Sequence, residues 1–177
     1  MRARGALVCV SILILAACGK NEEDSVSPPT PPANSVQWSI TGDLSSDAQG
    51  EIAQLSVPAP SGDAHLSLQL QVEGGSTLNL TGTAGDVAVR KASYTVNNSK
   101  ESCWHGRLTL RSGDARQDFR AGDRDGLLVF EKASAERVEG TLYLPALETD
   151  ASGTDLPGGK QVTVHAAFSA AVEAIAP

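Results

Sequence analysis

The chain has 177 residues, of which 4% are aromatic, and a formal net charge of −7 at pH 7. It contains no run rich in lysine or arginine, and an acidic surface repels phosphate backbones, so we expect no nucleic-acid partner. The same charge disfavours direct adsorption of the polypeptide onto anionic lipid.

Residues 1–17 have the layout of a secretory signal peptide, in which two arginines precede an apolar run from Ala6 to Ala17. The run is too short to span a bilayer, which requires about 20 apolar residues. It ends in Leu-Ala-Ala-Cys at residues 15–18, which resembles the lipobox of bacterial lipoproteins. The resemblance implies that Cys18 becomes the first mature residue and carries the lipid. An ordinary cleaved signal followed by an incidental cysteine is the alternative.

Lipid on Cys18 would anchor the protein to a membrane without insertion of the polypeptide. Acyl chains such as palmitate contribute about 0.8 kcal/mol per buried methylene, so several chains on one residue retain a polar domain. The lipoprotein resemblance implies a cell-envelope location. Because Gly19 rather than Asp follows the cysteine, it also implies transport across the periplasm to the outer membrane if the host is Gram-negative. Without residues 1–17 the formal charge is −9, from 12 basic and 21 acidic side chains.

Residues 18–35 form a tether in this interpretation. Three acids precede a Ser/Pro tract that has four prolines between Pro28 and Pro32. Such a composition favours extended polyproline II, which spans about 3 Å per residue and needs no packed core. Residues 36–177 then remain as a single β domain, since about 140 residues suit one hydrophobic core.

Apolar residues alternate with polar ones through most of this domain, which is the pattern of half-buried strands. The expected inward-facing sets are Val36, Trp38 and Ile40; Ala53, Leu55 and Val57; Leu66, Leu68, Leu70 and Val72; Leu78 and Leu80; Val87 and Val89; Tyr94 and Val96; Trp104, Leu108 and Leu110; Val138, Leu142 and Leu144; and alternate residues from Val162 to Val172. The segment Leu127–Phe130 is a continuous apolar run and shows no alternation. A change of phase before Tyr94 predicts a bulge or bend around residues 90–93. The last segment also fits a helix face, but its β-branched start favours a strand.

This pattern predicts an all-β fold: an antiparallel β-sandwich of eight or nine strands, with a closed β-barrel as the alternative. The polar segment Ala115–Arg120 is interpreted as a solvated loop, and GDRDG at residues 122–126 as a turn. The segments Arg137–Pro145 and Lys160–Val172 are loosely similar to the closing hairpin of uncharacterised β-rich envelope lipoproteins. That resemblance implies no functional residues.

The only cluster of reactive residue types is SCWHG at residues 102–106. Strand geometry places Cys103, His105 and Arg107 on one face, where thiol and imidazole could form a reactive or ligand-binding pair. Side chains two residues apart on a strand lie about 7 Å from each other, however, and a free cysteine is most often a small buried hydrophobe. We therefore assign no catalytic residue. Cys9 leaves with the signal and Cys18 is acylated, so no disulfide is expected.

The three histidines fall on separate strands without the spacing of zinc motifs, so neither a metal site nor a cofactor is expected. The leading hypothesis is a non-catalytic, membrane-anchored envelope lipoprotein that presents a β-sandwich interaction module to a protein or glycan partner. The alternative is a small-ligand carrier with a barrel lumen. A hydrolase or thiol enzyme that uses Cys103 and His105 is the third hypothesis.

Overall fold

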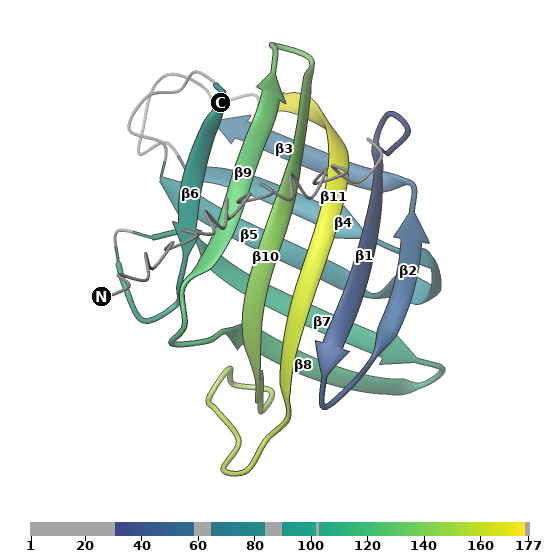
Figure 1. Ribbon diagram of the computed structural model, residues 1–177, viewed down its shortest axis with the longest axis vertical. Coiled ribbons are helices and arrows are strands. Elements are labelled where there is room, and N and C mark those ends of the chain that lie inside the picture. The colour runs from purple at the N-terminus through teal and green to yellow at the C-terminus, as the bar shows by residue number, and fades with distance from the viewer. Residues whose placement is uncertain (1–30, 59–64, 84–89, 102, 176–177) are drawn as a thin grey trace, which may run out of the picture.

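The computed structural model describes residues 31–58, 65–83, 90–101 and 103–175, which form an all-β fold (Figure 1). The predicted fold class is confirmed. The described strands are β1 (Ser35–Gly42), β2 (Ser46–Gly50), β3 (Ile52–Pro58), β4 (His65–Gln71), β5 (Thr77–Thr83), β6 (Ala92–Val96), β7 (His105–Ser112), β8 (Ala115–Ala121), β9 (Gly126–Ala133), β10 (Arg137–Thr149) and β11 (Gln161–Ile175), with one 3-10 turn, η1 (Glu73–Gly75).

The strands lie in two layers that cross at a steep angle (Figure 1). The front layer has the order β2-β1-β11-β10-β9-β6, and the back layer has the order β3-β4-β5-β7-β8. All of these pairings are antiparallel. The eleven described strands exceed the eight or nine that periodicity predicted.

Two long strands, β10 and β11, connect the layers. Residues 138–143 of β10 pair with β9 in the front layer, and residues 146–149 pair with β8 in the back layer. Similarly, β11 pairs with β1 over residues 162–169, and its residues 171–175 then pair with β3 in parallel orientation. Strand pairing therefore continues from one layer into the other at two corners, and both layers enclose the same core.

The core is filled by the inward-facing residues of both layers. The largest fully buried side chains are Phe119, Phe130, Phe168, Ile40, Leu55, Leu66, Leu68, Leu70, Leu78, Leu80, Leu108 and Leu128. Burial of each stabilises the fold by about 1.5–3 kcal/mol relative to exposure, which offsets the backbone entropy lost in strands. Around Trp104, the rings of Tyr94 and Phe130 lie 5.2 and 6.1 Å away between centroids. Gly82 has no side chain, which leaves room for the Trp104 ring, because a Cβ at residue 82 would overlap that ring.

The segment Ala115–Arg120 is strand β8, so its interpretation as a solvated loop was wrong. Phe119 is buried in the core, whereas the charged residues on the other face are neutralised by partners. A strand of this kind contains too few apolar residues for periodicity to detect. The short strand β2 was also missed, since only Ala48 of its residues packs on the core as a partly buried apolar side chain.

The C-terminal segment is a strand, as its β-branched start predicted, and the GDRDG turn leads into β9 at Gly126. The expected strand at Val87 and Val89 lies outside the described residues. The chain bends at Lys91, as one of the two alternatives predicted, but Ala92 and Ser93 pair with β9 in unbroken register and form no bulge. A register shift occurs instead between β9 and β10, at Glu139 and Gly140. No helix among the described residues has the length and apolar character needed to cross a bilayer.

Candidate functional site

The outer face of the front layer brings together side chains from strands far apart in the sequence. Six paired residues form one row across β6, β9, β10, β11, β1 and β2; in that order they are Thr95, Leu127, Tyr143, His165, Ser39 and Asp47. The next row contains Ser93, Val129, Thr141, Ala167, Gln37 and Gln49. Because inward and outward residues alternate along each strand, these twelve side chains share the face opposite the core. We call them the front platform.

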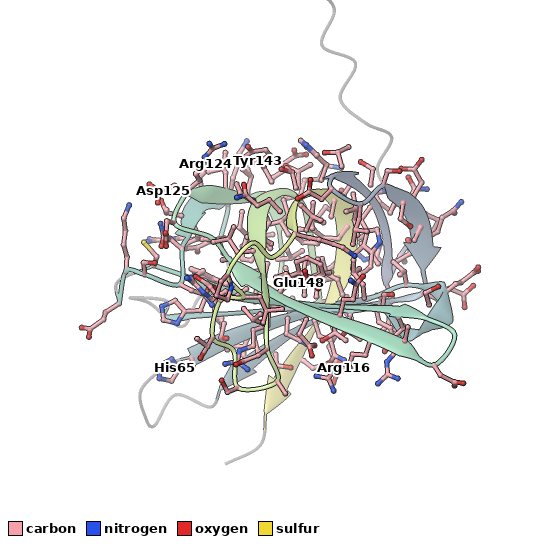
Figure 2. All side chains as sticks on the ribbon, turned by 90° about the horizontal axis from the view of Figure 1, so that it is seen from below. His65, Arg116, Arg124, Asp125, Tyr143 and Glu148 are labelled. Atoms are coloured by element: carbon pink, nitrogen blue, oxygen red, sulfur yellow. The ribbon has the colours of Figure 1, made fainter. Side chains whose placement is uncertain are left out.

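Among the described residues four large apolar side chains are exposed, and two of them, Leu127 and Tyr143, are paired with each other on the front platform. Leu127 is 47% exposed and Tyr143 is 43% exposed, whereas Leu128, next to Leu127 in the chain, is fully buried. The other two are Ile52 of β3 and Leu156 in the loop after β10. Figure 2 shows Tyr143 on the outer side of the front layer. The Tyr143 and His165 rings meet edge to face, with centroids 5.2 Å apart. A surface hollow follows this face from Leu127 to Ser39 and continues along β2 towards η1.

The front platform carries almost no formal charge in an otherwise acidic protein. Among its residues only Asp47, on the edge strand β2, is an acid, and none is a lysine or arginine. The adjacent pair of Lys132 and Glu139 forms an ion pair at 2.6 Å, so its charges neutralise each other. The platform offers hydroxyl and amide groups around two exposed apolar side chains, which is the composition of a binding surface for an uncharged ligand.

The outer face of the back layer is polar, and much of its charge is internally paired. Arg120 donates from Nε to Asp155 Oδ1 at 2.6 Å, which holds the loop after β10 against β8. Burial alone would raise the pKa of Asp118, but hydrogen bonds from Thr109 and Arg116 and the nearby arginine charges outweigh it and lower that pKa. Figure 2 shows His65 and Arg116 on this side, opposite Tyr143. This face presents no large exposed aromatic side chain among the described residues.

A polar network joins the loop after β6 to the GDRDG turn before β9. The buried Asn97 donates from Nδ2 to Asp125 Oδ1 at 2.6 Å and accepts from the Ser99 amide at 2.8 Å. Lys100 Nζ lies 2.8 and 2.9 Å from the two Asp125 oxygens. Hydrogen bonds from Lys100 and Asn97 lower the pKa of Asp125, and the bond to Asp125 raises the pKa of Lys100. The Asp125 carboxylate is thus held by protein donors.

The network fixes the turn that leads into the front platform, since Asp125 is two residues before Leu127. Ser99 Oγ donates to Asp123 Oδ1 at 2.7 Å, so both aspartates of the turn are bound. Within the described parts of the chain, no group of three or more histidine, cysteine, aspartate or glutamate residues is arranged to hold a metal ion.

Cys103 and His105 lie beside this network, on either side of the buried Trp104. The Cys103 thiol is free and half-buried. His105 Nε2 donates to the Lys100 carbonyl oxygen at 3.1 Å, and the Cys103 amide donates to the same oxygen at 3.2 Å. Both residues are described, and the structure records no hydrogen bond between their side chains. One imidazole nitrogen is therefore occupied by a backbone partner. Cys18 lies outside the described residues.

Sequence reasoning treated His165 only as one of three histidines on separate strands, placed Leu127 in a continuous apolar run, and did not select Tyr143. These residues are brought together by strand register, which a linear pattern does not specify. The fold and this face define an all-β, two-layer protein with one uncharged, partly apolar surface. No protein-family model, curated protein or solved structure matches the chain.

Proposed function

We propose that this protein is a non-catalytic lipoprotein of the cell envelope, held at the membrane by lipid on Cys18, which presents the front platform to an envelope protein or glycan. The observation that carries the proposal is the exposure of Leu127 and Tyr143, side by side in strand register, on an outer sheet face. Exposed apolar side chains grouped on a polar protein are characteristic of interaction surfaces.

The point where the tether meets the domain supports this arrangement. Ser35 begins β1, and its amide and Oγ both donate to the Pro32 carbonyl oxygen, at 3.2 and 2.7 Å. Ala53 of β3 donates its amide to Asn34 O at 3.1 Å. The chain leading from the proposed anchor thus joins the domain at one end of the strands. The front platform occupies a flank of the strands, where a partner can approach.

The small-ligand carrier hypothesis requires a space within the core. Among the described residues, the core contains the fully buried rings of Phe119, Phe130 and Phe168, which favours a surface site over an internal one. The thiol-enzyme hypothesis requires the His105 imidazole to activate Cys103. The bond from His105 to a backbone carbonyl gives that hypothesis no support.

Photocrosslinking of the full-length protein in cells tests the proposal. A photoreactive residue at Leu127 places the probe on the platform, and one at Gln69 is a matched control on the exposed back layer. We expect an adduct with an envelope component at position 127 and little or none at position 69. Equal yields at both positions, or no adduct at either in a variant that unfolds like the wild type, would contradict the proposal.

A further inference from the structure

We infer that the front platform binds a neutral oligosaccharide. This inference rests on the proposed function and narrows its partner to a glycan.

The side chains of the platform have the chemistry that sugar rings require. The C–H faces of a pyranose are apolar and pack on aromatic rings, for which Tyr143 is exposed. Sugar hydroxyls are both donors and acceptors, and the flanking Thr141 and Ser39 hydroxyls and the Gln37 amide can serve in either role. Apolar contact and adaptable hydrogen bonding therefore lie next to each other on one surface.

The charge of the platform selects a neutral ligand. The platform has no lysine or arginine to pair with the carboxylates of an anionic polysaccharide, and Arg111, which lines the hollow beyond β2, is accompanied there by Glu73. The net negative charge of the whole chain also repels such a polymer. A basic protein would be attracted to the acidic chain, but the platform has only Asp47 to pair with it. A neutral saccharide is not repelled by the acidic chain and needs no charged partner on the platform.

The size of the platform also favours a glycan over a protein. Six strands about 4.8 Å apart give a strip about 24 Å long, and its two rows lie about 7 Å apart along the strands. The resulting area, roughly 170 Å², is well below the roughly 800 Å² that each partner contributes to a standard protein interface. A strip of this shape accommodates a short linear saccharide across the strands.

The platform is ordered before any ligand arrives. The three central strands β11, β10 and β9 are hydrogen-bonded to neighbours on both sides, so Tyr143, His165 and Leu127 stand on fixed backbone. The edge-to-face contact with His165 further restricts the Tyr143 ring. Binding then orders few protein groups, which reduces the entropic cost of holding a polar ligand.

Titration of the purified full-length protein with sugars tests the inference. The probes are neutral oligomers of glucose, mannose, galactose and N-acetylglucosamine, with a uronic-acid oligomer as the anionic control, followed by calorimetry and ligand-observed NMR. Tyr143→Ala removes the ring, Tyr143→Phe retains it, and Gln69→Ala is the control on the back layer. We expect a neutral oligomer to bind, with affinity about tenfold weaker in Tyr143→Ala and almost unchanged in the other two variants.

Three results would overturn the inference. These are binding that Tyr143→Ala leaves unchanged, stronger binding of the anionic oligomer, and no binding of any neutral oligomer. If no sugar binds but the probe at Leu127 captures a polypeptide in cells, the platform is a protein site and the proposed function stands without the glycan. If the probe at Leu127 also captures nothing, both proposals fail.

Discussion

The buried amide of Asn97 provides a quantitative test of how the loops beside the front platform are held. Its side chain is 0% exposed and makes three hydrogen bonds: to Asp123 O at 3.3 Å, to Asp125 Oδ1 at 2.6 Å and from the Ser99 amide at 2.8 Å. A typical hydrogen bond contributes about 1 kcal/mol net. Asn97→Ala should therefore lower the free energy of unfolding by about 2–3 kcal/mol.

The isosteric variant Asn97→Asp separates polar chemistry from packing. It replaces a donor by a carboxylate that faces Asp125, so the variant should be strongly destabilised at neutral pH. The loss should shrink as the pH falls towards the ordinary aspartate pKa of about 4, where the repulsion is relieved by protonation.

Urea unfolding followed by tryptophan fluorescence measures both effects, because the buried Trp104 lies next to the network: its carbonyl oxygen accepts a hydrogen bond from the backbone amide of Asn97 at 2.7 Å. The exposed Gln69→Ala, which lies outside the network on the back layer, is the control and should change the free energy of unfolding by less than about 0.5 kcal/mol. An Asn97→Ala variant as stable as the control, or an Asn97→Asp deficit that does not depend on pH, would refute this account of the network.

Three further predictions concern the two layers. Phe168→Ala should cost about 3–5 kcal/mol in urea unfolding, and Leu127→Ala less than about 1 kcal/mol, because Phe168 is buried and Leu127 is half-exposed; equal losses would contradict the assignment of faces. Gly140→Ala should lower Tm markedly, since a Cβ at residue 140 overlaps Val129 O across the β9–β10 pairing. A Tm equal to that of the wild type would show that the two backbones are not so close at this point. The lowered pKa of Asp118 contributes stability above about pH 4, and this stability is lost as the pH falls through the folded-state pKa. Asp118→Asn should therefore make the free energy of unfolding fall less steeply with acid. Parallel pH–stability curves for the variant and the wild type would contradict this role of Asp118.

The strands that were predictable from the sequence are those with one strongly apolar face. In β4, Leu66, Leu68 and Leu70 alternate with Ser67 and Gln69, and this alternation alone gives both the strand and its orientation. In β8, the alternating face contains Phe119 and Ala121, and the opposite face is charged. Its stability comes from partners distant in sequence, such as the Asp155 carboxylate that binds Arg120, and local composition does not contain that information.

The short edge strand β2 was missed for a different reason. Its backbone pairs with β1, but its sequence, SDAQG, has no apolar alternation. Gly50 ends the strand where a Cβ would overlap Gln71 O, so the glycine that resembles a turn signal is required by close packing of two backbones.

The front platform could not be predicted because its parts belong to six strands. Tyr143 and Leu127 become neighbours only through the β9–β10 register, and His165 joins them through the β10–β11 register. A shift of one residue in either pairing would turn the aligned side chains towards the core. Alternation shows which residues of most strands face outward, but not which of them meet, and in the continuous apolar run Leu127–Phe130 it does not show which residues face outward.

The central claim is that Cys18 is lipidated and fixes the domain to a membrane. Intact-mass and N-terminal peptide analysis of the protein extracted from native membranes tests it most directly. The account predicts a mature chain that begins at Cys18 and carries the added mass of acyl chains on that residue. A chain that begins elsewhere, or an unmodified thiol at residue 18, would contradict both the proposed location and the function inferred from it.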